Sequence, residues 1–195
     1  MGRTIRLLTI SGSLRAESSN TSALVALELV APSGVHVTHY RDLGELPHFN
    51  PDLDAEGMTP AASVAALRAA FAAADAVVIC SPEYAHGVPG SLKNALDWMV
   101  SDLDLPGKPI ALLNLSPRSI HAQDSLRETL TTMSTRVIPA ASLTLPLSGR
   151  RLSAEEIAAN STLAAILRES LAELVAAVAT QAELPSFPVN KLSGN

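Results

Sequence analysis

The sequence has one cysteine, few aromatic residues and no long apolar run, and each shortage excludes a class of protein. Cys80 alone cannot form an intrachain disulfide or a multi-cysteine metal or iron–sulfur site. Aromatic residues make up only 3% of the chain, which disfavours a sandwich built on Tyr, Phe and Trp. No apolar stretch reaches the roughly 20 residues that span a bilayer, and no secretory leader is recognisable. We therefore expect a cytoplasmic protein with no membrane partner.

Positive charge is also scarce. The formal net charge is −5, whereas a nucleic-acid protein needs a clustered basic face. The five histidines show no metal-binding spacing such as H-x-x-x-H. His36 and His39 lie three apart in a predicted strand, so their side chains face opposite ways. We expect neither a nucleic-acid partner nor a metal site.

The sequence is rich in aliphatic residues: 47% of its 195 residues are hydrophobic, and most of these are Ala, Leu and Val. This composition favours helices packed on a sheet, and the length fits one domain with a substantial core. No repeat, linker or low-complexity segment divides the chain. We expect a single domain over residues 1–184 and an irregular C-terminal tail over residues 185–195.

Strands and helices are predicted to alternate along the chain. Apolar or alternating segments predict strands at residues 3–10, 35–40, 76–80, 109–115 and within 137–145. A helix is expected after each strand. Asn20 or a neighbouring serine is expected to cap the first helix, and Thr59 the second. The third is expected from about Pro89 past Trp98 and the fourth to end near Thr135, and the Ser153–Glu156 capping box is expected to open the fifth, which could break at Asn160–Ser161. Such alternation requires a parallel sheet. We expect a flavodoxin-like three-layer α/β/α fold with a five-stranded sheet in the order 2-1-3-4-5.

The loop after the first predicted strand has the composition of a phosphate site. It offers a glycine, small hydroxyl side chains, backbone N–H groups at a helix start and one arginine. It is neither a G-x-G-x-x-G nor a Walker A sequence, which disfavours a dinucleotide fingerprint or an NTPase. A serine-rich turn with a solvated arginine is the alternative interpretation. The candidate phosphate ligands are Ser11, Ser13, Arg15, Ser18, Ser19, Asn20 and Thr21.

The segment from Ser81 to Trp98 is the most specific motif in the chain. Its prolines and glycines predict a rigid turn between the third strand and its helix, beside the first loop at the switch point of the sheet. Such a turn can offer backbone N–H and C=O groups to the edge of a planar heterocycle. Tyr84 is expected to pack near that ring.

With these motifs the sequence resembles the NADPH-dependent FMN reductase family, which includes quinone, azo-dye and chromate reductases. The resemblance covers about the first half of the chain. Two main motifs and one weaker match carry it: Gly12-Ser13-Leu14-Arg15 with Ser18 and Asn20, Pro82-Glu83-Tyr84 leading to Pro89-Gly90-Ser91-Leu92-Lys93-Asn94-Ala95-Leu96-Asp97-Trp98, and Leu46-Pro47 with Asn50-Pro51-Asp52-Leu53.

The resemblance implies bound FMN, NADPH or NADH as electron donor, and a quinone or similar small molecule as acceptor. It implies that Ser13, Arg15, Ser18 and Asn20 bind the FMN phosphate. It also implies that Pro82, Glu83 and Tyr84 flank the isoalloxazine, and we add Ala85, His86 and Ser116 as candidate cofactor contacts. Lys93, Asn94, Asp97 and Trp98 are expected to be scaffold and subunit-contact residues. No catalytic side chain is assigned, because the cofactor supplies the reaction.

The sequence departs from the family pattern in two places. Many relatives carry Asn after the tyrosine, where this chain has Ala85-His86. Relatives also have a glycine-rich loop after the fourth strand, whereas residues 116–121 contain no glycine, which makes backbone approach to the flavin harder. His86 and Arg118 are candidates for the phosphate of the nicotinamide donor, with a solvated surface position as the alternative for each.

The resemblance further implies a homodimer or homotetramer whose subunits wall each other's flavin pockets. We expect the lone Trp98 at that interface, with burial in its own subunit as the alternative. Two other functions stay open at this point. One is a flavodoxin-like electron carrier, and the other is a binding module that has kept the fold and lost the flavin.

Overall fold

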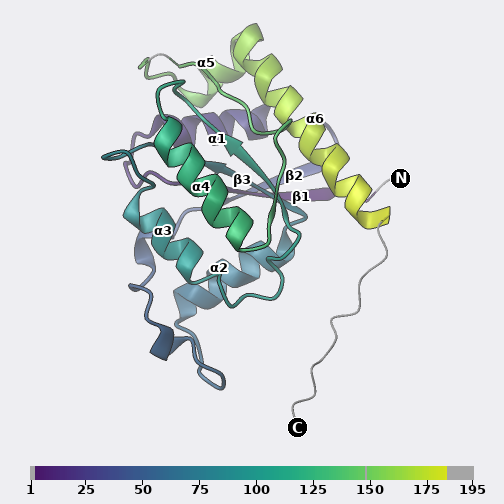
Figure 1. Cartoon of the computed structure of the whole chain (residues 1–195). Helices are drawn as coiled ribbons and strands as arrows, with labels where there is room; N and C mark the ends of the chain where they lie inside the picture. The colour runs from purple at the N-terminus through teal and green to yellow at the C-terminus, as the bar shows by residue number, and fades with distance from the viewer. Residues whose placement is uncertain (1–2, 148, 184–195) are drawn as a thin grey trace.

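A five-stranded parallel sheet in the order β2-β1-β3-β4-β5 forms the centre of the computed structural model, which describes residues 3–147 and 149–183 (Figure 1). The predicted fold class and strand order are therefore confirmed, whereas the predicted tail at 185–195 lies outside the described residues. In chain order the elements are β1 Ile5–Ser11, α1 Ser19–Leu29, β2 Val35–Tyr40, the 3-10 turns η1 Leu43–Glu45 and η2 Pro51–Leu53, α2 Ala62–Ala73, β3 Ala76–Cys80, α3 Gly90–Asp97, β4 Pro109–Leu113, α4 Ile120–Thr132, β5 Arg136–Val137, α5 Ala154–Ala159 and α6 Ser161–Glu183.

Burial along each strand follows its place in the sheet. Every residue of β3 and β4 is buried, as expected for central parallel strands covered on both faces. The edge strand β2 pairs only with β1 and is partly exposed along its length. This difference explains why β3 and β4 are continuous apolar runs while β2 alternates.

The helices form two layers, one on each face of the sheet (Figure 1). Leu7 and Val78 point into a core shared with α1, α5 and α6. Leu8 and Val77 point into the opposite core, shared with α2, α3 and α4. Adjacent strand residues thus feed opposite layers, as the two-residue period of a strand requires.

Two predicted helix signals are confirmed. Ser18 caps α1, its hydroxyl accepting a hydrogen bond from the Thr21 N–H at 3.4 Å. Ser153 and Glu156 form the reciprocal capping box that opens α5. The helical segment then breaks at Asn160, between α5 and α6. Local side-chain chemistry alone determines these boundaries, which is why they could be predicted.

Two other predicted boundaries are wrong. Helix α2 begins at Ala62 with Ala61 as an N-cap that has no side-chain acceptor, so Thr59 does not cap it. The burial of the α2 apolar face decides where that helix starts. Strand β5 ends at Val137, because Pro139 has no N–H to donate to the ladder, and only an isolated bridge at Thr144 resumes the pairing.

The expectation that Trp98 lies at a subunit interface is also wrong. Its side chain is 1% exposed, its Nε1 donates to the Pro47 carbonyl at 2.8 Å, and Phe49 packs edge-on against its ring at 5.0 Å. Asn94 reinforces this contact by donating to Pro47 and accepting from the Phe49 N–H. The helix motif and the weaker Leu46–Leu53 motif are therefore two halves of one structural contact.

Candidate functional site

The loop after β1 begins against the end of β3, at the switch point of the sheet. The Gly12 N–H donates to the Cys80 carbonyl at 2.9 Å, which continues the β1–β3 pairing into the loop. A Cβ at Gly12 would lie 2.7 Å from the Ser81 hydroxyl, so only glycine fits this close approach. The first loop is thus fixed beside the loop that follows β3.

Short hydroxyl hydrogen bonds give this first loop its shape. Ser11 accepts from the Ser13 N–H at 3.3 Å and from the Thr21 hydroxyl at 3.1 Å. Ser13 accepts from the Arg15 N–H at 3.4 Å. These side chains hold the loop from its beginning to the first turn of α1. The predicted phosphate ligands Ser11, Ser13 and Thr21 therefore stabilise the loop itself.

The same loop leaves a row of donors for an anion. No hydrogen bond within residues 3–147 and 149–183 uses the backbone N–H groups of residues 16–20. Residues 19 and 20 are the first of the eleven-residue helix α1, where N–H groups have no partner inside the helix and the dipole is positive. This arrangement can bind a phosphate.

Arg15 and Asn20 add side-chain donors to that row. Arg15 is exposed and makes no ion pair with any described residue. Asn20 is 9% exposed, and its Oδ1 accepts a hydrogen bond from the Cys80 thiol at 3.2 Å. Burial raises the pKa of Cys80, so the thiol stays protonated and remains a donor. The amide nitrogen of Asn20 is thereby left for another acceptor.

The loop after β3 is a tight backbone hairpin. Tyr84 and Gly87 exchange N–H···O hydrogen bonds of 3.1 and 2.9 Å. Between them, Ala85 and His86 have φ angles of 48° and 57°, in the left-handed region that favours Gly and Asn. An asparagine at position 85 would suit this conformation better than alanine does. Tyr84 is 52% exposed at the start of the turn.

Two contacts join this hairpin to the segment after β4. The Glu83 carboxylate accepts from the Ala122 N–H in the first turn of α4 at 2.9 Å. The rings of His86 and His121 stack with centroids 4.3 Å apart. Ser116 accepts from the Arg118 N–H at 3.2 Å, so the glycine-free loop also has a defined turn. Glu83 therefore positions the start of α4.

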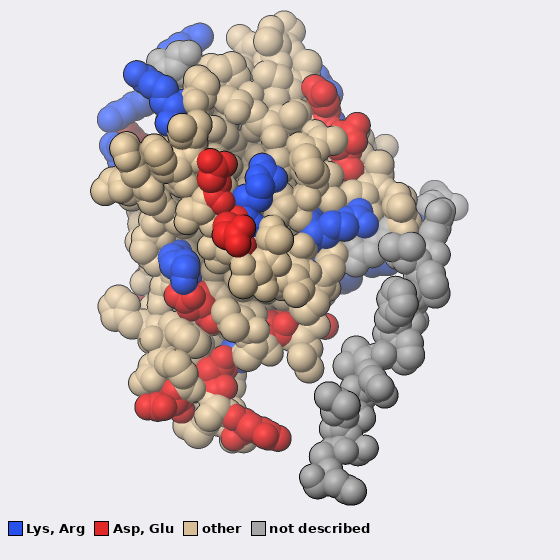
Figure 2. Space-filling view, in the orientation of Figure 1, with Lys and Arg blue, Asp and Glu red and all other residues tan. Residues whose placement is uncertain are grey.

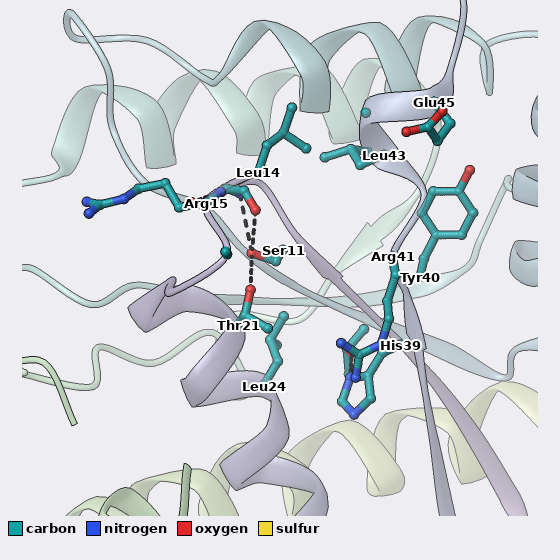
Figure 3. Close-up of a pocket in the computed structure, with 14 residues that line it drawn as sticks. Ser11, Leu14, Arg15, Thr21, Leu24, His39, Tyr40, Arg41, Leu43 and Glu45 are labelled. Atoms are coloured by element: carbon teal, nitrogen blue, oxygen red, sulfur yellow. Dashed lines mark hydrogen bonds between the residues drawn. The ribbon is translucent and has the colours of Figure 1, made fainter. Parts of the chain in front are cut away.

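The structure brings part of the predicted site together in a shallow pocket of about 420 Å³. It joins the first loop to the β3 hairpin and is lined by Gly12, Leu14, Arg15, Tyr84, Pro89, Gly90 and Ser91. The predicted ligands Ser11, Ser13 and Thr21 instead line a second cavity on the other side of the loop, shown in Figure 3. Ser18, Ser19 and Thr21 line a further hollow between the start of α1 and residues 151–154.

That second cavity contains residues that sequence reasoning missed. It lies between the ends of β1 and β2, and His39, Tyr40, Arg41 and Glu45 contribute to it. The available signal was Arg41 directly after the last residue of the second predicted strand. Strand ends on this side of an open parallel sheet face the ligand-binding edge.

Within the described residues, no group of three or more His, Cys, Asp or Glu side chains could hold a metal ion. No helix in that part of the chain is long and apolar enough to cross a membrane. The face shown in Figure 2 carries Lys and Arg interspersed with Asp and Glu, with no extended basic surface on it.

Known proteins resemble the chain in both sequence and fold. The family model for NADPH-dependent FMN reductase matches residues 5–148. A protein named NAD(P)H-dependent FMN reductase from Pseudomonas aeruginosa is 38% identical over 135 residues, which cover 67% of this chain and 71% of that protein. A quinone reductase from Escherichia coli K12 is 37% identical over 114 residues, which cover 57% of this chain and 60% of that protein.

A solved structure gives the same result for the fold. The flavoenzyme NAD(P)H:(acceptor) oxidoreductase FerB from Paracoccus denitrificans superposes with a TM-score of 0.73 at 26% identity. The match covers 90% of this chain and 98% of that one. These comparisons confirm the expected class of protein, a flavin-dependent oxidoreductase with a flavodoxin-like fold. The chain therefore belongs to the NADPH-dependent FMN reductase family.

Proposed function

We propose that the chain binds FMN across the first loop and the β3 hairpin and uses it to pass electrons from a reduced nicotinamide to a quinone or similar small acceptor. The observation that carries this proposal is the row of backbone N–H groups at residues 16–20, which have no partners in the described structure. This row directly follows Arg15, which lines the pocket that holds Tyr84. When bound, FMN supplies the chemistry by accepting a hydride and passing two electrons on. The protein supplies binding, orientation and exclusion of water.

The phosphate end fits the residues present. The N–H groups of residues 16–20 and the start of α1 would bind the phosphate oxygens, with Ser18 and Ser19 at the helix start. Arg15 would add a charge-assisted contact, and the Asn20 amide nitrogen a further donor. Ser11, Ser13 and Thr21 would act mainly by holding the loop in shape.

The hairpin after β3 and the loop after β4 fit the isoalloxazine end of FMN. Tyr84 would pack against the ring, and the backbone of Pro82, Ala85 and His86 would border its edge. Ser116 would approach from the loop after β4. Glu83 would act through the Ala122 N–H by keeping the start of α4 in place. No side chain is needed as an acid or base for hydride transfer itself.

The acceptor side is open and apolar. Leu14, Tyr84 and Ile120 are between 52% and 59% exposed, on the first loop, the hairpin and the start of α4. Such surface suits a flat, electron-poor molecule. Quinones have this character, and quinone reductases are among the relatives.

We also propose a homo-oligomer, through a different surface from the one first expected. Leu53, Met58, Val100 and Leu103 are 46–92% exposed. Their two segments lie side by side, because Arg68 bridges Asp54 at 2.8 Å and Ser101 at 2.9 Å. An apolar patch of this kind marks an interaction surface. Light scattering should give at least twice the chain mass, and a monomer would contradict the proposal.

The function is tested by identifying the flavin and then measuring turnover. The flavin released by heat from the purified protein should co-elute with FMN, since the first loop offers a monophosphate site and no pyrophosphate fingerprint. The FMN-loaded protein should oxidise NADPH or NADH when benzoquinone is added. Recovery of FAD as the main flavin would refute the assignment of FMN. Bound FMN without nicotinamide oxidation would indicate a flavodoxin-like electron carrier instead.

A further inference from the structure

The cavity between the ends of β1 and β2 has a volume of about 450 Å³, within the range of small-molecule sites (Figure 3). It lies behind the first loop, on the side away from Tyr84. Ser11 and Thr21 line it from the loop, and Leu24 from α1. Tyr40 and Arg41 line it from the end of β2. Most of its lining residues therefore differ from those of the pocket assigned to the flavin.

Its lining offers donors to an anionic ligand at two places, Arg41 and the Tyr40 hydroxyl, and it also contains the carboxylate of Glu45. Arg41 is exposed and forms no ion pair with the described residues. The Tyr40 hydroxyl is buried and has no hydrogen-bond partner in that part of the chain. Burial first, and then the charge of Asp42, raise the pKa of Tyr40, so its hydroxyl remains a donor. Leu24 and Leu43 supply apolar wall.

The histidine beside Arg41 is held in place by two hydrogen bonds. His39 Nδ1 lies 2.5 Å from the Thr9 hydroxyl, and its Nε2 lies 2.8 Å from the Glu28 carboxylate. In Figure 3 the guanidinium of Arg41 lies next to this ring. The base of the cavity is thus preorganised, and two exposed arginines, Arg15 and Arg41, line it.

The two hollows adjoin at the first loop. Leu14 and Arg15 line both the flavin-side pocket and the β1–β2 cavity. Gly44 is in the wall of the cavity, and a Cβ added to it would lie 3.5 Å from the Leu14 side chain. A ligand long enough to reach past Leu14 would therefore extend from one hollow to the other.

We propose that the β1–β2 cavity holds the 2′-phosphoadenosine end of NADPH, with Arg41 as the contact of the 2′-phosphate. The assignment rests on the proposed function for the other end of the donor, whose nicotinamide would reach the Tyr84 pocket over Leu14. Arg41 directly follows β2, at the edge of the parallel sheet where ligands bind, and its guanidinium can form charge-assisted hydrogen bonds with a phosphate monoester. A free nucleotide offers the same phosphate monoester, so the test must separate these two sources.

The first test is calorimetry on the flavin-free and the FMN-loaded full chain with 2′,5′-ADP and with 5′-ADP. Arg41→Ala should weaken binding of 2′,5′-ADP by about 10- to 100-fold, the scale of a charge-assisted hydrogen bond, and leave 5′-ADP nearly unchanged. Arg41→Lys should restore part of the loss. Arg168→Ala, an exposed arginine on α6, is the matched control and should have no effect. Unchanged binding in Arg41→Ala would overturn the proposal.

The second test is steady-state kinetics of the FMN-loaded enzyme. Arg41→Ala should raise KM for NADPH by the same factor and leave KM for NADH, kcat and FMN affinity unchanged. A larger effect from Arg118→Ala would overturn the proposal in favour of the loop after β4. If Arg41 governs 2′,5′-ADP binding but not KM for NADPH, the cavity is a free-nucleotide site and the donor assignment is overturned. Failure of the proposed function would appear separately, as absent flavin or absent turnover with intact 2′,5′-ADP binding.

Discussion

The loop after β1 and the loop after β3 meet at the same edge of the sheet but are stabilised in different ways. The first is held by side-chain hydroxyls, and within the described residues it has no non-glycine residue with positive φ. The second is closed by backbone hydrogen bonds and places Ala85 and His86 in the left-handed region. The first loop therefore has backbone N–H groups available for a ligand, whereas in the second loop the N–H groups of Tyr84 and Gly87 close the turn.

This difference explains what each loop can do. A loop with unused N–H groups at a helix start is preorganised to bind an anion, so its contribution to ligand affinity should depend on the phosphate of the ligand. A strained hairpin depends on the rest of the protein, here on Glu83 and on the stacked His86 and His121. The contribution of this hairpin to ligand affinity should depend on the isoalloxazine ring.

Removing the cation of the first loop should have the largest effect. Arg15→Ala should weaken FMN binding by about 1.5–3 kcal/mol, the scale of a hydrogen bond to a charged group. Riboflavin, which has no phosphate, should bind to the variant as it does to the parent chain. Flavin-fluorescence titration of both ligands measures the difference. Equal losses for FMN and riboflavin would show that Arg15 supports the loop and does not contact the phosphate.

Removing the tie between the hairpin and α4 should have an intermediate effect. Glu83→Ala leaves the Ala122 N–H without its acceptor and should lower the free energy of unfolding by about 0.5–2 kcal/mol, as loss of a helix cap does. Glu83→Gln keeps an acceptor oxygen and should recover most of this. Urea denaturation of the flavin-free protein gives both values. Identical losses in the two variants would mean that the negative charge matters more than the hydrogen bond.

Relieving strain in the hairpin should have the smallest effect, and of opposite sign. Ala85→Asn should raise the free energy of unfolding by about 0.5–1 kcal/mol, because Asn tolerates the left-handed region better than Ala. The matched control is Ala16→Asn in the first loop, where φ is not positive and no gain is expected. Thermal unfolding compares the two. A loss of stability in Ala85→Asn would disprove the account of strain at this position.

The elements set by local pattern or capping could be predicted from the sequence. The apolar runs of β3 and β4, the alternation of β2 and the Ser153–Glu156 box all carry their own signal. The two main loops could also be placed, because strand ends in a parallel sheet meet at one edge.

The rest depends on contacts between distant segments. Burial of Trp98 follows from the Pro47 carbonyl, 51 residues away, which satisfies its N–H. A sequence shows a lone tryptophan but not the loop that covers it. The start of α2 was mispredicted for a similar reason, since packing of Val64, Leu67 and Phe71 outweighs the missing cap. The β1–β2 cavity was missed because its residues come from three separate segments.

The most direct test is a titration of the flavin-free protein with FMN and with riboflavin. If the donors at residues 16–20, with Arg15 and Asn20, hold the phosphate, FMN should bind at least about 100-fold more tightly, since several hydrogen bonds to a charged group contribute together. The tighter binding should also fall as salt rises, because charge is involved. FMN and riboflavin binding with equal affinity, or neither binding, would contradict the central claim that this loop is the phosphate site of a flavin enzyme.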